Sequence, residues 1–193
     1  MSKGLAVVAI ALAIGIGGSA RAQPVELEGV KFDPAVQVGG QALQLNGAGI
    51  RTRAIFKVYV AGLYVPQKST DADALLAQKG PRRVAIHMLR NVDAGTFATS
   101  LADGLKANHA EQQLAAFKAQ TDALTATLKA IGEAKKGDAI HFEYVPEAGT
   151  RIVLNGQPRG EPIAGEAFFA AVLRIWLGNR PADADLKKGM LGG

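Results

Sequence analysis

Hydrophobic and polar residues along the chain repeat with periods typical of both strands and helices. Strand patterns, rich in β-branched and aromatic residues, occur at 25–32, 42–45, 50–64, 82–90, 138–145 and 150–155. Helical patterns, with apolar residues three or four positions apart, occur at 71–79, 93–107, 110–132, 164–178 and 183–190. Because strands and helices are partly segregated along the chain, the pattern predicts an α+β domain with helices packed against an antiparallel sheet.

The segment 50–64 has the longest strand pattern, and we expect it to be a central strand. Side chains alternate between the two faces of a strand. One face would carry Arg51, Arg53, Ile55, Lys57, Tyr59, Ala61 and Leu63, and the other Ala54, Phe56, Val58, Val60 and Tyr64. The face with the arginines and Tyr59 therefore either borders solvent or lines a cleft.

Residues 1–22 have the pattern of a cleavable signal peptide. Lys3 precedes an apolar run at 4–16, which is too short to cross a hydrocarbon core of about 30 Å. Ala20 and Ala22 occupy the small-residue positions of a cleavage site, so we expect cleavage after Ala22 and a periplasmic or secreted protein. The alternative is an uncleaved membrane anchor. No later stretch of the sequence is long and apolar enough to span a membrane, and residues 23–193 are predicted to form a single domain.

Composition narrows the classes of function. The sequence has no cysteine, so it offers no disulfide and no thiol nucleophile. The net charge of +5 falls to +3 without the predicted signal peptide, and the basic residues are scattered, which argues against nucleic-acid binding. Its three histidines lack partners at metal-ligand spacing, and no nucleotide-binding loop or nucleophile elbow occurs. We therefore expect neither a metal nor another cofactor.

The segment 45–66, LNGAGIRTRAIFKVYVAGLYVP, has a G-x-G-x-R stretch (Gly47, Gly49, Arg51) followed by a K-V-Y-V-A-x-L-Y strand. Further along come MLRNVDAGTFATSLADGL, FEYVPEAGTRIVLNG and AFFAAVLRIWLGNRPADADLKKGML. Together these segments resemble the bacterial, exported branch of the chalcone isomerase-like family over nearly all of residues 23–193. The resemblance implies an open antiparallel β-sheet with a helical layer on one face and a ligand cleft between the two.

The resemblance also indicates which catalytic groups are missing. Plant chalcone isomerases hold the substrate with an arginine and bind its ketone oxygen through a threonine and a tyrosine. Arg51 corresponds best to that arginine, with Arg53 as the alternative, and Tyr59 takes the place of the threonine. Phe97 stands where these enzymes have the catalytic tyrosine, Gly104 where they have an asparagine, and Phe169 where they have a serine or threonine. Because the loss of one oxyanion donor costs on the order of a hundredfold in rate, the resemblance implies a protein without this activity.

Non-catalytic relatives in plastids bind fatty acids through an arginine and a tyrosine. By analogy Arg51, or Arg53, and Tyr59 would hold a small apolar carboxylate such as a fatty acid, with Phe97 and Phe169 as apolar walls. Each of these residues has a structural alternative: a solvated or ion-paired arginine, a core tyrosine, and core phenylalanines.

Two other functions stay open at this point. An isomerase or intramolecular lyase would need an acid or base near Arg51, for which Tyr59 and Lys57 are the candidates. An accessory protein of an envelope complex would expose an apolar patch. The sequence makes no prediction of the oligomeric state.

Overall fold

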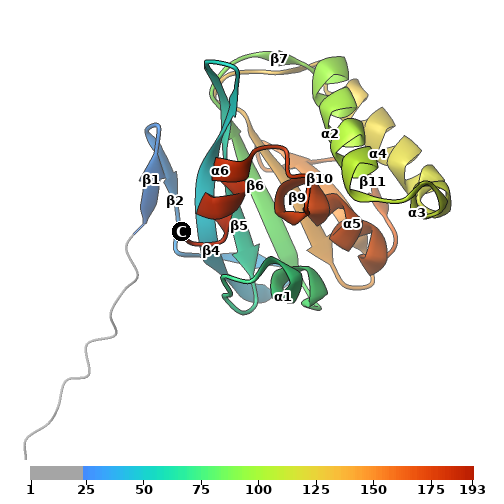
Figure 1. The fold of residues 1–193 in the computed structure, drawn as a ribbon, viewed down its shortest axis with the longest axis horizontal. Helices are drawn as coiled ribbons and strands as arrows, with labels where there is room; N and C mark the ends of the chain where they lie inside the picture. The colour runs from blue at the N-terminus through green and yellow to red at the C-terminus, as the bar shows by residue number, and fades with distance from the viewer. Residues whose placement is uncertain (1–23) are drawn as a thin grey trace, which may run out of the picture.

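The computed structural model describes residues 24–193, so the predicted signal peptide lies outside the described residues. Its centre is a seven-stranded sheet in which every neighbouring pair is antiparallel, in the order β11-β10-β9-β6-β5-β4-β3 (Figure 1). Its strands are β3 (Ala35–Val38), β4 (Gln41–Arg53), β5 (Phe56–Val65), β6 (Arg82–Met88), β9 (Ala139–Val145), β10 (Gly149–Leu154) and β11 (Gln157–Ile163). The open antiparallel sheet of an α+β domain, predicted from the sequence, is confirmed.

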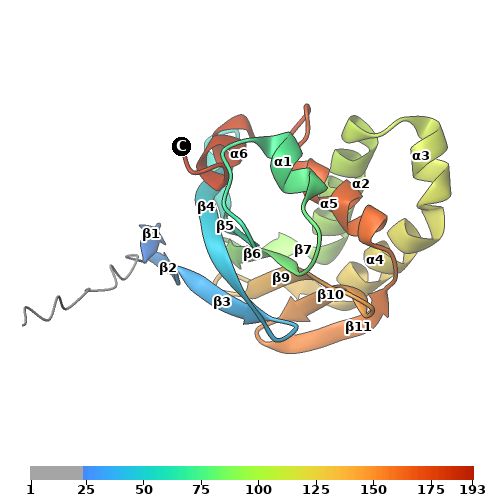
Figure 2. The same ribbon diagram turned by 90° about the horizontal axis from the view of Figure 1, so that it is seen from below.

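The sheet curls, and the helical layer packs on its inner face (Figure 2). The helices are α1 (Ala72–Ala77), α2 (Ala94–Asn108), α3 (Glu111–Ala116), α4 (Lys118–Ala130), α5 (Glu166–Leu177) and α6 (Ala184–Met190). Helix α5 is the most deeply buried of these and contributes Phe168, Phe169 and Trp176, all 0% exposed. None of the described helices combines the length and hydropathy needed to span a membrane.

A smaller apolar cluster lies on the opposite face of the sheet. The hairpin of β1 (Val25–Leu27) and β2 (Val30–Phe32) brings Phe32 against Val60 and Tyr64 of β5. On the same face Glu143 is buried between Arg83, at 2.6 Å, and Arg151, at 2.7 Å. The central strands are thus covered on both faces. On the outer face the cover is the β1–β2 hairpin, at the N-terminal end of the described chain.

The predicted strand at 50–64 is wrong, because the chain reverses in the middle of it. Strand β4 ends at Arg53, Ala54 and Ile55 form a two-residue turn, and β5 starts at Phe56, which pairs with Arg53. Ala54 adopts a left-handed backbone with φ of 54°. Glycine, asparagine and aspartate usually mark such turns, so the Ala-Ile pair gives no sequence signal for this hairpin.

A bulge in β5 also corrects the predicted faces. The register slips between the Arg51–Tyr59 and Thr52–Lys57 pairs, which leaves Val58 as the extra residue. Val58 packs with the inner cluster beside Tyr59, whereas Lys57 contacts Glu28 of the β1–β2 hairpin at 2.7 Å. Arg51 and Tyr59 share the inner face as predicted, but Lys57 leaves it and Val58 joins it.

Other boundaries differ in smaller ways. The predicted helix at 110–132 is broken at Phe117 into α3 and α4, and the predicted strand at 25–32 is the β1–β2 hairpin, with φ positive at Glu28 and Gly29. The sequence pattern missed β3, the edge strand β11, and a short pair formed by β7 (Val92–Asp93) and β8 (Glu133–Ala134). Six of the seven residues of β11 are exposed, so it lacks the alternation that reveals a half-buried strand.

The glycines of the G-x-G-x-R stretch are packing residues. Helix α6 lies directly on β4, and a Cβ at Gly47 would collide with the backbone of Gly189 and Gly192. A Cβ at Gly49 would lie 2.9 Å from the carbonyl oxygen of Leu186. Only residues without a side chain permit this approach, so the motif fixes α6 against the strand that carries Arg51.

Candidate functional site

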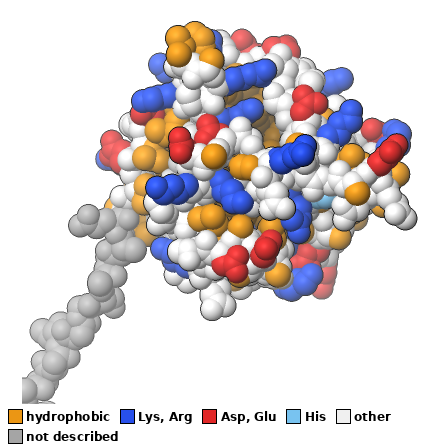
Figure 3. Space-filling view, in the orientation of Figure 1, with side chains coloured by type: hydrophobic (Ala, Val, Ile, Leu, Met, Phe, Trp, Pro, Cys, Tyr) orange, Lys and Arg blue, Asp and Glu red, His pale blue; other side chains and the backbone are white. Residues whose placement is uncertain are grey.

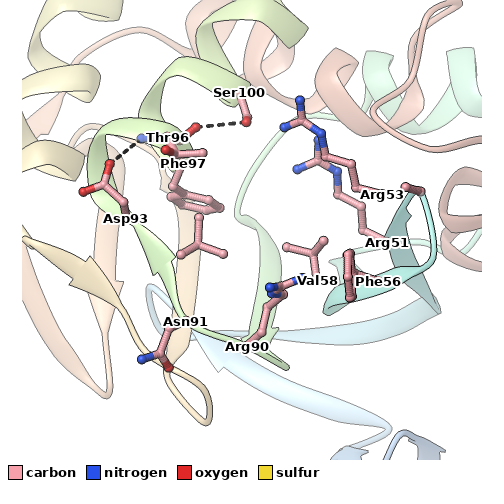
Figure 4. Close-up of a pocket in the computed structure, with 12 residues that line it drawn as sticks. Arg51, Arg53, Phe56, Val58, Arg90, Asn91, Asp93, Thr96, Phe97 and Ser100 are labelled. Atoms are coloured by element: carbon pink, nitrogen blue, oxygen red, sulfur yellow. Dashed lines mark hydrogen bonds between the residues drawn. The ribbon is translucent and has the colours of Figure 1, made fainter.

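A cleft of about 440 Å³ opens where the β4–β5 hairpin faces the N-terminal half of α2 (Figure 4). One wall is formed by the hairpin and the other by α2, and the connection from β6 to α2 closes one end. The lining residues are Arg51, Arg53, Ala54, Phe56, Val58, Arg90, Asn91, Val92, Asp93, Thr96, Phe97 and Ser100. The cleft therefore combines three arginines with an apolar surface of valines and phenylalanines.

None of these three arginines has a carboxylate partner. Among the described residues, no Asp or Glu oxygen lies within 4.0 Å of the guanidinium groups of Arg51, Arg53 or Arg90. In contrast, the arginines on the outer face of the sheet, Arg83 and Arg151, both contact Glu143. The cleft therefore carries three guanidinium groups that no carboxylate of the described residues pairs directly.

Arg51 is half-buried and lies deepest of the three. Its Cζ lies 5.5 Å from the centre of the Tyr59 ring, close enough for a cation–π contact. Its Nε is buried and has no hydrogen-bond acceptor among the described residues. The tyrosine ring therefore supports the guanidinium from below, while donor groups of Arg51 stay available to an anion in the cleft.

Tyr59 lies beneath the cleft, with its side chain 1% exposed. Its hydroxyl oxygen accepts a hydrogen bond from Nε1–H of Trp176 on α5 at 2.9 Å. Burial raises the pKa of Tyr59 above its ordinary value, although the positive charge of Arg51 and the bond from Trp176 oppose the rise. The phenol is therefore neutral at physiological pH and is held by the core.

Polar groups on the α2 wall are engaged in forming the helix. The Asp93 side chain caps α2 by accepting a hydrogen bond from the backbone N–H of Thr96 at 2.9 Å. The Ser100 hydroxyl donates to the carbonyl oxygen of Thr96, also at 2.9 Å (Figure 4). Between them the Phe97 ring, 4% exposed, supplies apolar surface to the cleft. The α2 wall therefore offers the apolar surface of Phe97 beside polar groups that hydrogen-bond within the helix.

The structure brings together three of the five residues predicted for the site. Arg51, Arg53 and Phe97 line one cleft, so both arginines left open by the sequence lie at it. Tyr59 contacts Arg51 but does not line the cleft, and its hydroxyl points to Trp176. Of the predicted pair, Arg51 lines the cleft, and Tyr59 supports its guanidinium through the aromatic ring.

Phe169 lies elsewhere, which corrects its predicted role as a cleft wall. Its ring is fully buried, 5.7 Å from the ring of Tyr144 and 5.4 Å from Cζ of the buried Arg82. Gly104, which matches a polar catalytic position of plant enzymes, faces Ile175 of α5. Both positions belong to the packing of the helical layer, because α5 fills the interior of the curled sheet.

Sequence reasoning missed Arg90 and the contribution of Phe56. Arg90 follows β6, and its Cζ lies 4.6 Å from the centre of the Phe56 ring at the start of β5. Tyr59 pairs with Met88, so the end of β6 meets the beginning of β5. Predicting the contact between Arg90 and Phe56 would have required the position of the Ala54–Ile55 turn, because that turn determines where β5 begins.

The sequence matches the chalcone isomerase-like family over residues 24–192. The chain belongs to the chalcone isomerase-like family. The match spans the described elements from β1 to α6, and so includes the β4–β5 hairpin and α2, which form the cleft. A search of curated proteins gives no match to this chalcone isomerase-like chain.

Among solved structures, the chalcone isomerase-like chain is similar to a fatty-acid binding protein from Arabidopsis thaliana. The TM-score is 0.68 and the sequence identity 14%, and the alignment covers 88% of this chain and 96% of the plant protein. At this identity the likeness establishes the common fold. Within residues 24–193 no three His, Asp or Glu side chains converge in a way that could hold a metal ion.

Proposed function

We propose that this chalcone isomerase-like protein binds a small apolar carboxylate, such as a fatty acid, in the cleft between the β4–β5 hairpin and α2. The observation that most supports this proposal is that three arginines without carboxylate partners face a cleft whose remaining surface is largely apolar. An amphiphile with an anionic head satisfies both halves of this surface. The plant protein of similar fold is itself named a fatty-acid binding protein, which supports the same class of ligand.

In this proposal Arg51 is the anchor. A planar guanidinium can bind a carboxylate through two parallel hydrogen bonds, and such charge-assisted bonds are stronger than neutral ones. The Tyr59 ring holds the guanidinium, so part of the entropic cost of fixing Arg51 is met before the ligand arrives. Arg53 and Arg90 lie further toward solvent and add positive potential at the entrance.

A binding role fits the cleft better than proton transfer. A general acid or base is most effective with a pKa near the working pH. Of the two candidates, Tyr59 has a raised pKa and a hydroxyl held by Trp176, and Lys57 points to Glu28 on the outer face. At the position of the plant catalytic tyrosine, Phe97 offers only apolar surface. These features support a non-catalytic protein.

The decisive experiment is ligand identification. The protein is purified without detergent, measured by native mass spectrometry, and extracted with organic solvent to identify any bound acid. We expect a carboxylated apolar ligand in the wild type and its loss in Arg51→Met, which keeps an unbranched apolar stem but removes the charged guanidinium. Arg159→Met, on the exposed edge strand β11, is the matched control. Equal ligand content in both variants would refute the proposed anchor.

Export is the second part of the proposal. The pattern of residues 1–22 supports cleavage after Ala22 and release to the periplasm or the exterior. Intact-mass measurement of protein from a fractionated bacterial host tests this directly. We expect a chain that starts at Gln23 in the periplasmic fraction, and a full-length chain that stays with the membrane would contradict it.

A further inference from the structure

The tip of the β4–β5 hairpin exposes two large apolar side chains. Ile55 is 85% and Phe56 53% exposed, and among the described residues the only other exposed large hydrophobic side chain is Val25, at 37%. The hairpin tip lies at the top of Figure 1. The two side chains therefore form an exposed apolar point at one end of the molecule.

The fold does not require an isoleucine at this position. Two-residue hairpin turns favour glycine, asparagine and aspartate, and Ala54 instead holds a left-handed conformation without glycine's freedom. The Ile55 side chain belongs to neither apolar cluster of the protein. Together with Phe56 it forms an exposed apolar point that is available for a contact outside the molecule.

Basic residues flank the tip on both strands, and the Asp183 carboxylate approaches β4 at the backbone N–H of Thr52, at 2.9 Å. Arg51 and Arg53 precede the turn, Lys57 follows it, and Arg90 stacks on Phe56. Of these four cations only Lys57 has a carboxylate partner among residues 24–193, the half-exposed Glu28. In Figure 3 a group of hydrophobic side chains lies at the upper left of the molecule, with Lys and Arg side chains below it and acidic side chains further along the top. An apolar point within a collar of cations complements a surface with an apolar interior and an anionic boundary.

We propose that the hairpin tip docks on membranes that contain anionic phospholipid, with Ile55 and Phe56 inserted at the boundary between headgroups and acyl chains. Apolar side chains flanked by Lys and Arg bind such interfaces through burial of apolar area and through attraction to anionic headgroups. A protein partner of ordinary affinity would need a contact of roughly 800 Å² on each side, far more than two projecting side chains supply. The bilayer is therefore the occupant that this tip fits.

Membrane docking would place the cleft at the lipid surface. Phe56 and Arg53 belong both to the tip and to the cleft lining, and Arg51 lies behind them. An amphiphile leaving the bilayer would meet these arginines directly. The docking proposal goes beyond ligand binding and does not depend on it, because the tip and its charges are present whatever the cleft holds.

The absence of cysteine from the sequence allows the tip to be probed alone. Ile55→Cys is labelled with an environment-sensitive fluorophore and mixed with vesicles of phosphatidylcholine containing about one third phosphatidylglycerol. We expect a blue shift and a rise in intensity with these vesicles, and neither with vesicles of pure phosphatidylcholine or at high salt. Gln157→Cys, on the opposite edge of the sheet, is the control and should not respond.

Vesicle co-sedimentation then measures the contribution of each group. Ile55→Ser should weaken binding at least about tenfold, because it removes the more exposed of the two inserted apolar side chains. Val25→Ser, an equivalent change at another exposed apolar residue in the same chain, should not. Arg53→Glu should weaken binding at least about fivefold, and Arg159→Glu should leave it nearly unchanged.

An unresponsive label at position 55, or equal vesicle binding by Ile55→Ser and Val25→Ser, would overturn the docking proposal. A label that responds equally to neutral and anionic vesicles would overturn the role given to the cations. Ile55 does not line the cleft, so Ile55→Ser should still bind dodecanoate in solution. Failure of docking and failure of ligand binding are thereby distinguished.

Discussion

At the scale of single residues, the hydrogen bond between Tyr59 and Trp176 joins the site to the core. The tyrosine ring supports Arg51 on one side, and its hydroxyl accepts the indole N–H on the other. Both side chains are at most 1% exposed, so neither polar group can turn to solvent if the other is removed. The pair therefore links the position of the anchor to the packing of α5 on the sheet.

Tyr59→Phe separates the two roles. The change leaves the Trp176 N–H buried without an acceptor, so we expect a loss of about 1–3 kcal/mol in the free energy of unfolding, measured with urea. The ring under Arg51 remains, and fatty-acid affinity should change by less than about threefold, since a support needs no hydroxyl. A large loss of affinity at unchanged stability would instead show that the hydroxyl contacts the ligand.

His141 makes the stability of the fold sensitive to acid. It lies on the outer face of the sheet with Arg83, Glu143 and His87 around it. Burial, together with the nearby charge of Arg83, lowers its pKa from 6.5 to about 4, despite the opposing charge of Glu143. Between these values the unfolded chain binds a proton that the folded protein does not. The stabilising effect of neutral His141 is therefore complete above about pH 6.5 and is lost as the pH falls toward about 4.

His141→Gln should reduce this loss. Urea unfolding at about pH 7 and about pH 4.5 gives the change in unfolding free energy for the wild type and the variant. We expect the acid-induced loss to be smaller in the variant, by up to about 3 kcal/mol for a shift of this size. His109→Gln, on the end of α2, serves as the comparison. Identical pH dependence in wild type and His141→Gln would show that the histidine does not titrate between these values.

At the scale of elements, the sequence predicted most of the helices and strands but misplaced the hairpin that carries the site. Asp71, Asp93 and Asp183 cap α1, α2 and α6. From the apolar repeats that follow the first two caps, the bounds of α1 and α2 were predicted to within one or two residues. The β4–β5 turn was missed because Ala54 and Ile55 resemble strand residues. That turn, with the bulge at Val58, decides which side chains enter the cleft, so the element that shapes the cleft carried the weakest sequence signal.

The contact of α6 with β4 gives a prediction at this scale. Gly47→Ala places a methyl group against the backbone of Gly189 and Gly192, which cannot move away as a flexible side chain would. We expect α6 to be displaced, with a loss of about 2 kcal/mol or more in the free energy of unfolding. Urea unfolding measures the loss, and faster amide exchange across 184–190 would locate it. Unchanged stability would mean that β4 adjusts to the methyl group.

At the scale of the whole molecule, the composition of the cleft depends on long-range packing and on the placement of charges, which the sequence alone does not reveal. The family resemblance indicated Arg51 and Phe97, since each has a counterpart at a fixed place in the motif. It could not show that the Phe169 side chain packs against Tyr144, or that Arg90 joins the cleft from the end of β6, because both depend on the curl and register of the sheet. The unpaired state of the three arginines likewise follows only from where every carboxylate lies.

Binding at the cleft should stabilise the whole domain, because its two walls come from the sheet and from the helical layer. A ligand that binds only the folded state raises the free energy of unfolding by about 2.7 kcal/mol at a hundred times its dissociation constant. We expect dodecanoate to raise the midpoint of thermal unfolding of the wild type and of Arg159→Met. In Arg51→Met the same concentration should stabilise by only about 0.4–1.4 kcal/mol, since losing a charge-assisted contact weakens binding by about ten- to a hundredfold. Dodecanol, which has the same chain without the charge, tests the apolar wall alone. If dodecanol stabilised the wild type as much as dodecanoate does, apolar burial and not Arg51 would determine binding.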